Sequence, residues 1–291
     1  MKTFEEVCAF AKKKGPKRCV VAGGDDTLTI KALRLAREQG ICKPVLVGNF
    51  QKIEQAIKDS AIKGLNFDII DGEPASRAVQ EVKENGDFLL KGKIPTPDFL
   101  RAILAPEGLR TDRILSHTAI LEIPGYHKLV FVTDGGMNVN PDLDTKIQII
   151  KNSIELARQL GIHNPKVAIL AASEEVNPKI PASIDAQELT NMNSRGKFPG
   201  TDIRGPLSLD LALSRDAARK KGFEGPVYGN ADILVVPDVA TGNIFAKGLI
   251  YFANTQAAGI ILGASKPVVM LSRADPPRMK VLTIALGVAV S

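Results

Sequence analysis

The sequence predicts an α/β fold with a mostly parallel sheet and helices on both of its faces. Short apolar runs rich in β-branched residues alternate with longer stretches that have the spacing of amphipathic helices. The apolar runs are typical of strands buried on both faces. Several of them end in glycine, which lets the backbone turn sharply at the edge of a sheet. The alternation is the pattern of successive βα units.

The first part of the chain follows this alternation closely. Residues 3–14 predict a helix, and strands are expected at 18–24 (RCVVAGG), 44–48 (PVLVG), 67–72 (FDIIDG) and 87–92 (DFLLKG). Helices are expected between these strands, one of them after Pro74. Asp25 or Asp26 is expected to cap the first of them, with Gly40 at its end, and Asn49 to cap the second. The turn GGDDT lacks the GxGxxG spacing of a dinucleotide-binding loop, so no Rossmann nucleotide site is expected.

The segment KGKIPTPDFLRAIL, which begins at Lys91, places a helix start directly after a strand. Thr96 is expected to be the N-cap and Pro97 the first helical residue, with Lys91, Lys93 and Arg101 nearby. Amides at a helix start and nearby cations suit a phosphate or pyrophosphate group. An ordinary capped helix with solvated lysines explains the same residues.

From Thr111 the pattern changes. RILSHTAILEI and HKLVFVTDGG predict two antiparallel strands joined by PGYH, and one α/β unit is expected to give way to another here. A polar turn (133–143), a long helix, a strand (166–173) and a helix flanked by prolines follow. Asp202, Arg204 and Gly205 predict a turn, again followed by a helix.

The stretch from Ala231 to Asp275 organises the rest of the chain. A strand at 233–237 leads to a turn with Asp238 and TGN (Thr241, Gly242 and Asn243), and then to a helix. Strands at 259–263 and 267–271 follow, the second delivering Ser272, Arg273 and Asp275 before a closing helix at 276–289. Such turns stand at the carboxyl edge of an α/β sheet.

These two turns predict an anion site. TGN is expected to open a helix and to point free N–H groups at the sheet edge. Hydroxyl and amide donors, together with the planar fork of arginine, suit phosphate. The alternative is purely structural, with Asp275 as the N-cap of the closing helix and Ser272 closing a turn.

Composition narrows the classes of function. The 291 residues are 44% hydrophobic and 24% charged, as in a soluble globular protein, and no apolar run reaches the roughly 18 residues that span a bilayer. The three cysteines fit a reducing compartment, so a cytoplasmic location is expected. The net charge is +6, but basic residues are interleaved with acids and there is no tryptophan, so no nucleic-acid partner is expected.

The sequence gives little support for other kinds of catalytic site. The three histidines, His117, His127 and His163, have no metal-ligand spacing, and each is expected to be structural or exposed. No GxSxG motif is present. Asp134, Asp202 and Asp238 follow strands but lie in separate turns, so no metal site is expected.

The residues also carry a family resemblance. PDVATGNIFAKGLIYFANTQAAGIILGASKPVVMLSRAD resembles the signature region of the phosphate acetyl/butyryl transferases. KGKIPTPDFLRAIL, VTDGGMNVNPDLDTKIQIIKNSIELARQLGI, EEVNPKIPASIDAQELTNM and GPLSLDLALSRDAA resemble the butyryl branch. The resemblance runs from about Ala75 to the C-terminus.

The resemblance implies a fold and a reaction. The fold would be two α/β domains with a cleft between them, as in the isocitrate and isopropylmalate dehydrogenases, with residues 1–120 and 260–291 in one domain and 121–259 in the other. The reaction would move an acyl group reversibly between CoA and inorganic phosphate, with acyl-CoA and acyl phosphate as partners and no cofactor. Members are homo-oligomers, so a dimer or a larger assembly is implied.

The resemblance also assigns residues. Ser272 and Arg273 match an active-site pair, where Ser272 would donate to the developing oxyanion and Arg273 would hold the phosphoryl group. Arg101 matches a family arginine and would contact phosphate or CoA. Acetyl-transferring relatives carry an aspartate where this chain has Met279, so Asp275 becomes a candidate base for the thiol proton. The full substrate-binding set would be Arg101, Thr241, Gly242, Asn243, Lys91 and Thr96.

Three alternative functions fit parts of this pattern. The first is a phosphate acetyltransferase. The second is a CoA- or acyl-phosphate-binding module without catalysis, for which Met279 is the main argument. The third is a metal- and NAD-dependent decarboxylating dehydrogenase of the same fold, which the lack of clustered strand-end aspartates disfavours. The acyl chain length, the base for the thiol, the size of the oligomer and the physiological direction stay open.

Overall fold

The structure is a computed structural model that describes residues 1–61, 66–270 and 275–291. It confirms the α/β fold class. The chain divides into two compact units: unit 1 holds Met1–Lys2 and Ile114–Gln256, and unit 2 holds Thr3–Arg113 and Ala257–Ser291. We had expected domain boundaries at residues 120 and 260, and that assignment stays a prediction.

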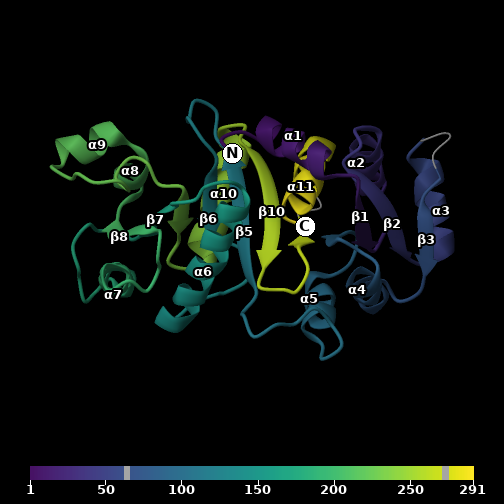
Figure 1. The fold of residues 1–291 in the computed structure, drawn as a ribbon, viewed down its shortest axis with the longest axis horizontal. Coiled ribbons are helices and arrows are strands. Elements are labelled where there is room, and N and C mark those ends of the chain that lie inside the picture. Colours follow the sequence, from purple (N-terminus) through teal and green to yellow (C-terminus); the bar gives the residue numbers. More distant parts are fainter. Residues whose placement is uncertain (62–65, 271–274) are drawn as a thin grey trace. The chain divides into compact units, whose positions relative to one another are not determined.

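Unit 2 is built on strands from both ends of the chain. Its elements are α1 (Phe4–Lys14), β1 (Lys17–Ala22), α2 (Thr27–Glu38), β2 (Cys42–Gly48), α3 (Phe50–Asp59), β3 (Asp68–Asp71), α4 (Pro74–Glu84), β4 (Phe88–Lys91), α5 (Thr96–Leu104), β10 (Gln256–Leu262), β11 (Val268–Val269) and α11 (Pro277–Val290). The strands are ordered β3-β2-β1-β4-β11-β10, and only the β10–β11 pair is antiparallel among them. Figure 1 shows β1, β2 and β3 side by side, with α3 next to the outermost strand β3.

Local signals start α2 and α3 where the sequence predicted. Asp26 and Asn49 cap α2 and α3 by accepting the backbone N–H three residues on, at 2.8 and 3.0 Å. Right-handed crossovers put α2 and α3 on one face of the parallel strands and α4, which returns from β3 to β4, on the other. The apolar helix α11 contacts α1 and α2. A Cβ on its Gly287 would lie 2.5 Å from the ring of Phe88, so the helix reaches β4 only because this residue is glycine.

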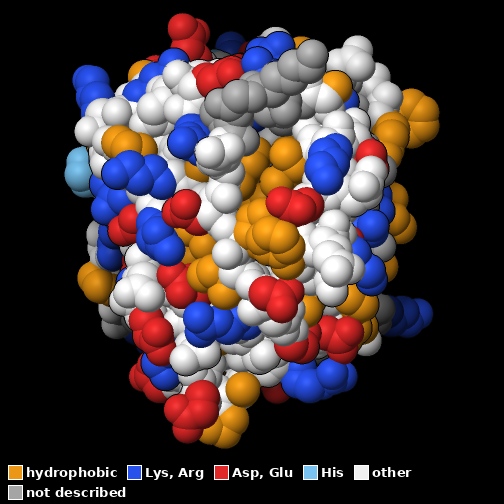
Figure 2. All heavy atoms as spheres, turned by 90° about the vertical axis from the view of Figure 1, so that its right-hand side faces the viewer, with side chains coloured by type: hydrophobic (Ala, Val, Ile, Leu, Met, Phe, Trp, Pro, Cys, Tyr) orange, Lys and Arg blue, Asp and Glu red, His pale blue; other side chains and the backbone are white. Residues whose placement is uncertain are grey.

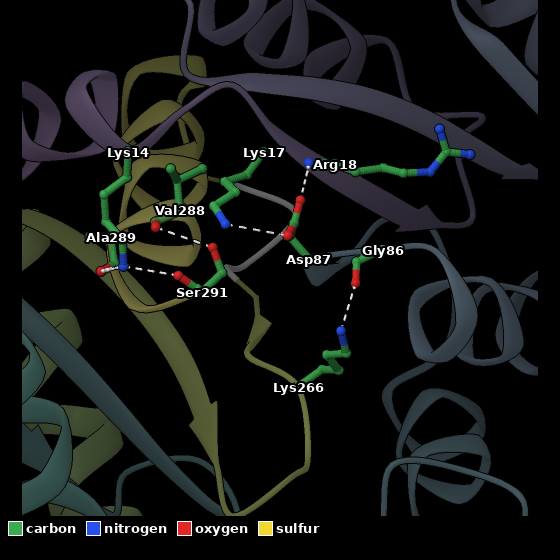
Figure 3. Close-up of polar contacts among 9 residues, drawn as sticks. All are labelled: Lys14, Lys17, Arg18, Gly86, Asp87, Lys266, Val288, Ala289 and Ser291. Atoms are coloured by element: carbon green, nitrogen blue, oxygen red, sulfur yellow. Dashed lines mark hydrogen bonds and ion pairs between the residues drawn. The ribbon is translucent and has the colours of Figure 1, made fainter.

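The amino edge of the unit 2 sheet is held by ion pairs and hydrogen bonds (Figure 3). Asp87, just before β4, accepts the backbone N–H of Arg18 at 2.7 Å and pairs with Lys17 at 3.5 Å. Lys266 donates to the carbonyl of Gly86 at 3.0 Å, which ties the start of β11 to β4. Lys14 donates to Ala289 and Ser291 at 3.1 and 2.9 Å and so holds the end of α11. These contacts stabilise the edge opposite the strands' carboxyl ends.

The surface beside β3 carries hydrophobic side chains among charged ones, as Figure 2 shows. A hollow of about 370 Å³ lies between α3 and β3, where Phe50, Ile57, Phe67 and Ile69 form most of its apolar wall. It flanks the outermost strand rather than the carboxyl edge of the sheet.

Unit 1 holds the remaining elements. They are β5 (Ser116–Glu122), β6 (Val130–Thr133), α6 (Leu143–Gln159), β7 (Lys166–Leu170), α7 (Pro181–Ser194), β8 (Asp202–Leu207), α8 (Leu209–Leu213), α9 (Arg215–Lys220), β9 (Ile233–Val235) and α10 (Val239–Phe252). The strand order is β5-β6-β9-β7-β8. The predicted antiparallel pair is confirmed, with Thr118 opposite Thr133, and the other pairs are parallel.

Strand β8 of unit 1 contradicts the sequence prediction. Residues 202–207, expected to be a turn, form strand β8, which pairs with β7 in parallel. Ile203, Pro206 and Leu207 are buried, and this burial outweighs the turn signal of Gly205 and Pro206. Proline is tolerated because β8 is the outermost strand of this unit and Pro206 needs no N–H partner on its free side. Within the described ranges, no helix is long and apolar enough to cross a membrane.

Candidate functional site

The carboxyl edge of the unit 1 sheet gathers polar residues from three strands. β6, β9 and β7 are parallel, so their carboxyl ends meet at one edge, and the antiparallel β5 begins there. Asp134 follows β6, Asp238 follows β9 by three residues, and His117 is the second residue of β5. The topology therefore brings two carboxylates and an imidazole to the same edge.

Asp134 is the buried centre of this edge. Its side chain is 2% exposed and accepts backbone N–H groups from His117, Gly136 and Met137 at 3.1, 2.9 and 2.9 Å. Asn138 adds its backbone N–H at 3.3 Å and its side-chain amide at 2.6 Å. Within the described part of the chain the carboxylate is thus held by N–H dipoles, and it folds residues 135–138 into a fixed turn. The sequence identified Asp134 only as an acid at a strand end.

Helix α10 begins earlier than the sequence predicted. Asp238 is its N-cap and accepts the backbone N–H of Thr241 at 2.8 Å, while the N–H of Gly242 bonds to the Asp238 carbonyl at 3.2 Å. The prediction that TGN points free N–H groups at the sheet edge is therefore wrong for Thr241 and Gly242. The helix starts at Val239 because Asp238 is the stronger cap.

TGN has a packing role instead. A Cβ on Gly242 would lie 2.7 Å from Cα of Gly135, so the start of α10 meets the turn after β6 backbone to backbone. The side-chain amide of Asn243 donates to the Gly135 carbonyl at 3.3 Å. The side chains of Thr241 and Asn243 stay exposed. The structure thus couples α10 to the turn that Asp134 folds.

His117, which the sequence predicted to be structural or exposed, also lies at this edge. Its ring packs on Gly136, where a Cβ would lie 2.8 Å from Cγ and 2.9 Å from Nδ1. Nδ1 is buried and has no hydrogen-bond partner among the described residues. Burial lowers the pKa of the imidazole, and the charge of Asp134 offsets this only in part. A neutral imidazole is therefore favoured at neutral pH. No spacing signal marks His117, because its setting depends on β5 pairing with β6.

The carboxyl edge of unit 2 carries cations and glycines. A Cβ on Gly92 would lie 2.1 Å from the carbonyl oxygen of Gly23, so the turns after β1 and β4 touch only because both residues lack side chains. The backbone N–H of Lys93 donates to Gly23 at 2.8 Å, and the Lys93 ammonium lies 3.4 Å from Asp25. Asp25 thus pairs with a lysine, whereas Asp26 caps the helix.

The predicted residues around α5 lie near this edge. Lys91 is the last residue of β4, and α5 begins at Thr96 with Pro95 as N-cap and no side-chain capping bond. The prediction of Thr96 as N-cap is therefore wrong by one residue. Pro95 takes the cap position because its backbone there is extended, a conformation close to the one its ring fixes. Arg101 lies further along the helix, is exposed, and pairs with Asp98 at 2.9 Å.

The third group of predicted residues follows β11. Ser272 and Arg273 lie outside the described residues. Asp275 is 9% exposed and immediately precedes Pro276, the N-cap of α11. Asp275 is therefore not the cap that the sequence predicted, because the helix begins one residue later than that cap requires. Met279 is buried in the first turn of α11. Across residues 1–61, 66–270 and 275–291, no three His, Cys, Asp or Glu side chains gather closely enough to hold a metal.

The described residues define an α/β protein with lysines and a helix start at the carboxyl edge of unit 2, and with two carboxylates and an imidazole at the carboxyl edge of unit 1. Residues 73–288 match the family model described as phosphate acetyl/butaryl transferase, and the chain belongs to that family. It is 38% identical to the phosphate butyryltransferase of Clostridium acetobutylicum over 100% of this chain and 99% of that protein.

Two further relatives extend the comparison. The chain is 39% identical to the phosphate acetyltransferase of Thermotoga maritima, over 98% of both chains. The crystal structure of a branched-chain phosphotransacylase from Enterococcus faecalis aligns with a TM-score of 0.81 at 32% identity, over 94% of this chain and 99% of that one. The predicted family is confirmed.

Proposed function

We propose that this protein transfers a short-chain acyl group, butyryl in preference to acetyl, reversibly between CoA and inorganic phosphate. The observation that carries the proposal is the full-length similarity to a phosphate butyryltransferase within the matched family. Butyryl specificity is the finer part, because a phosphate acetyltransferase is equally similar in identity. The substrates would be acyl-CoA, phosphate and acyl phosphate, and the reaction would need no cofactor. We place the enzyme in the cytoplasm, in keeping with its three free cysteines.

The chemistry proposed is a direct attack of the CoA thiol on the carbonyl carbon of the acyl phosphate. Ser272 would donate to the developing oxyanion and Arg273 would hold the phosphoryl group. Lys91, Thr96 and Arg101 would contact phosphate or CoA, and the position of Lys91 and Thr96 near the carboxyl edge of unit 2 supports this. Thr241 and Asn243 would contribute side chains rather than amides, with Gly242 providing the close packing. Asp275 stays a candidate base from the sequence, as a substitute for the family aspartate that Met279 replaces.

The test is release of thiol from butyryl-CoA on addition of phosphate, without metal or NAD. A series of acyl-CoA substrates from C2 to C6 then gives the specificity from kcat/KM. Absence of phosphate-dependent release from every member would contradict the proposed reaction and favour a binding module. A higher kcat/KM for acetyl-CoA than for butyryl-CoA would overturn the butyryl preference alone.

Arg273→Ala tests the assigned site. Removing a charge partner of the transition state typically lowers turnover by about two to three orders of magnitude. We expect a loss of that size in kcat, measured with butyryl-CoA and phosphate, and little change in Tm. Arg195→Ala, which removes an exposed arginine paired with Glu188, is the matched control and should leave turnover unchanged. Near-normal turnover in Arg273→Ala would move the site elsewhere.

We also propose that the protein is a homo-oligomer, a dimer or larger. The support is α10, an apolar helix in which Ile244, Tyr251 and Phe252 are 71, 68 and 92% exposed and Gly242 alone is buried. Exposed apolar surface of this kind marks contact with another protein surface. Sedimentation equilibrium measures the assembly directly, and a monomer at all concentrations would contradict the proposal.

A further inference from the structure

His117 is a titratable group that the assigned site does not use. Of the three histidines, His127 and His163 are exposed and precede β6 and β7, at the amino edge of the unit 1 sheet. His117 alone lies at the carboxyl edge, beside the turn that packs on α10. His117 therefore lies at the opposite edge of the unit 1 sheet from the other two histidines.

The backbone of His117 is fixed from both sides. Its N–H donates to Asp134 at 3.1 Å, and its carbonyl accepts from the Thr133 hydroxyl at 3.0 Å. Gly136 lies against the ring, which limits the rotation of the imidazole. Such double fixation is what a group that exchanges protons needs, because the reacting nitrogen must keep one position.

The ring nitrogens of His117 make no hydrogen bond to the residues that the structure describes. Nδ1 is buried without a partner, and no hydrogen bond joins either nitrogen to the described part of the chain. An unpaired buried polar atom costs about 1–3 kcal/mol, so its retention calls for an explanation. The residue as a whole is half-buried.

The surroundings of the ring favour a neutral base. Asp134 is the charged group that acts on it. From α6, which packs on β5, the residues that bond to β5 are Asn152 and Ser153, both neutral. Burial disfavours the imidazolium and outweighs the charge of Asp134, which stabilises it only in part, so the pKa of the imidazole is lowered. The neutral imidazole is the form that can take up a proton as a general base.

We propose that His117, rather than Asp275, accepts the proton of the CoA thiol when CoA attacks the acyl phosphate, and returns it to the leaving phosphate. This inference rests on the proposed function. The sulfur forms its bond to the carbonyl carbon as the S–H proton passes to the imidazole. The C–O bond to phosphate then breaks with its electron pair on the phosphate oxygen. The imidazolium protonates the phosphate, so the enzyme ends as it began. In the reverse direction the imidazolium protonates the departing thiolate.

The first experiment compares His117→Gln with the double variant His127→Gln/His163→Gln. General base catalysis contributes typically about 10²–10⁴-fold, so kcat of His117→Gln should fall by that factor, with KM for CoA changed less than about threefold. The acidic limb of the wild-type pH profile of kcat/KM should disappear in His117→Gln and persist in the double variant. A kcat within threefold of wild type, or a loss of activity that keeps the acidic limb, would overturn the proposal.

The second experiment does not depend on the folding of a His117 variant. In His127→Gln/His163→Gln, His117 is the sole histidine. Diethylpyrocarbonate should then abolish activity in step with modification of one histidine, CoA should slow the loss, and hydroxylamine should restore activity. Full activity after complete modification would exclude His117 as the proton acceptor. If the wild type shows no phosphate-dependent thiol release at all, the proposed function fails instead, and the two failures are distinguished.

Discussion

Asp134 and Asp232 are two buried carboxylates at opposite edges of the same sheet, and they are neutralised in different ways. Asp232, 4% exposed and just before β9, lies 2.5 Å from the Lys128 ammonium and accepts the N–H of Lys166 at 2.8 Å. Among the described residues Asp134 has no cationic partner, and backbone and amide N–H groups hold it. One carboxylate is matched by a charge, the other only by dipoles.

The two carboxylates therefore have different roles, because Asp232 stabilises the fold whereas Asp134 acts on the candidate site. The Asp232–Lys128 pair joins the starts of β6, β7 and β9, and Lys128 also donates to the Asn230 carbonyl at 2.7 Å. Burial lowers the pKa of Lys128, and Asp232 counters that effect. Asp134 instead keeps its negative charge available to its surroundings, where His117 lies. A charge compensated only by dipoles at a carboxyl edge can still act on a neighbouring imidazole or a ligand.

The largest effect on the free energy of unfolding is expected from breaking the pair of Asp232 and Lys128. Asp232→Ala leaves the ammonium of Lys128, whose side chain is 11% exposed, without its carboxylate. Removing one partner of a buried pair costs about 3–5 kcal/mol, so we expect a loss of that order in the free energy of unfolding, measured by urea denaturation. Replacing both partners, as Asp232→Leu/Lys128→Met, should recover most of it, because no buried charge remains. A loss below about 1 kcal/mol in Asp232→Ala would show that the pair is solvated.

Local sequence patterns predicted some elements of the fold correctly and others wrongly. Caps such as Asp26 and Asn49, and strands such as Val45–Val47, follow from local patterns and were predicted correctly. β8 was missed because its turn-like residues at 204–206 are offset by burial against the rest of unit 1. The start of α10 was placed too late because Thr241 and Gly242 resemble turn residues.

Only some residues of the candidate site could be predicted from local sequence patterns. Lys91 and Thr96 were found because a strand followed directly by a helix start is a local signal. Asp134 and His117 are 17 residues apart in sequence, and their bond forms only when β5 pairs with β6. A single histidine in an apolar strand forms no spacing motif with other catalytic residues. Ser272 and Arg273 entered through family resemblance, and their roles stay predictions.

A smaller loss in the free energy of unfolding is expected from Gly136→Ala, in the turn that Asp134 holds. The added methyl group would lie 2.8 Å from Cγ of His117, so the ring must move. Overpacking of this kind costs typically about 1–3 kcal/mol. Turnover should fall with it, because the imidazole leaves its position.

A double-mutant cycle isolates the contact. In a His117→Ala background the ring is absent, so Gly136→Ala should cost much less in unfolding free energy than it does in the wild type. The measurement is thermal or urea unfolding of the four proteins, together with kcat for the two that keep the histidine. Equal costs in both backgrounds would mean that the alanine strains the turn itself rather than displacing the ring.

The smallest expected effect concerns carboxylates that are matched by a charge but exposed. Asp210 lies 3.0 Å from Lys221, which also contacts Glu174 at 2.7 Å. Hydrogen bonds from Ser208 and Lys221 lower the pKa of Asp210 to about 2. An aspartate in an unfolded chain has a pKa of about 3.9. A carboxyl group with a lowered folded pKa stabilises the protein above the unfolded value. That contribution is lost as pH falls from about 4 to about 2.

Asp210→Asn should therefore reduce the free energy of unfolding by only about 0.2–1 kcal/mol at pH 7, because exposed pairs are screened by solvent. The difference from wild type should shrink across the acid range and also in high salt, since ions screen the pair. Urea titrations at pH 7, 4 and 2.5 measure it, with Asp216→Asn as control for loss of an exposed carboxylate paired to Arg219 within its own helix. A difference that stays constant with pH would assign the effect to lost hydrogen bonds with Ser208 rather than to charge. Charge matching at an exposed site would then contribute nothing measurable, in contrast to the buried pair at Asp232.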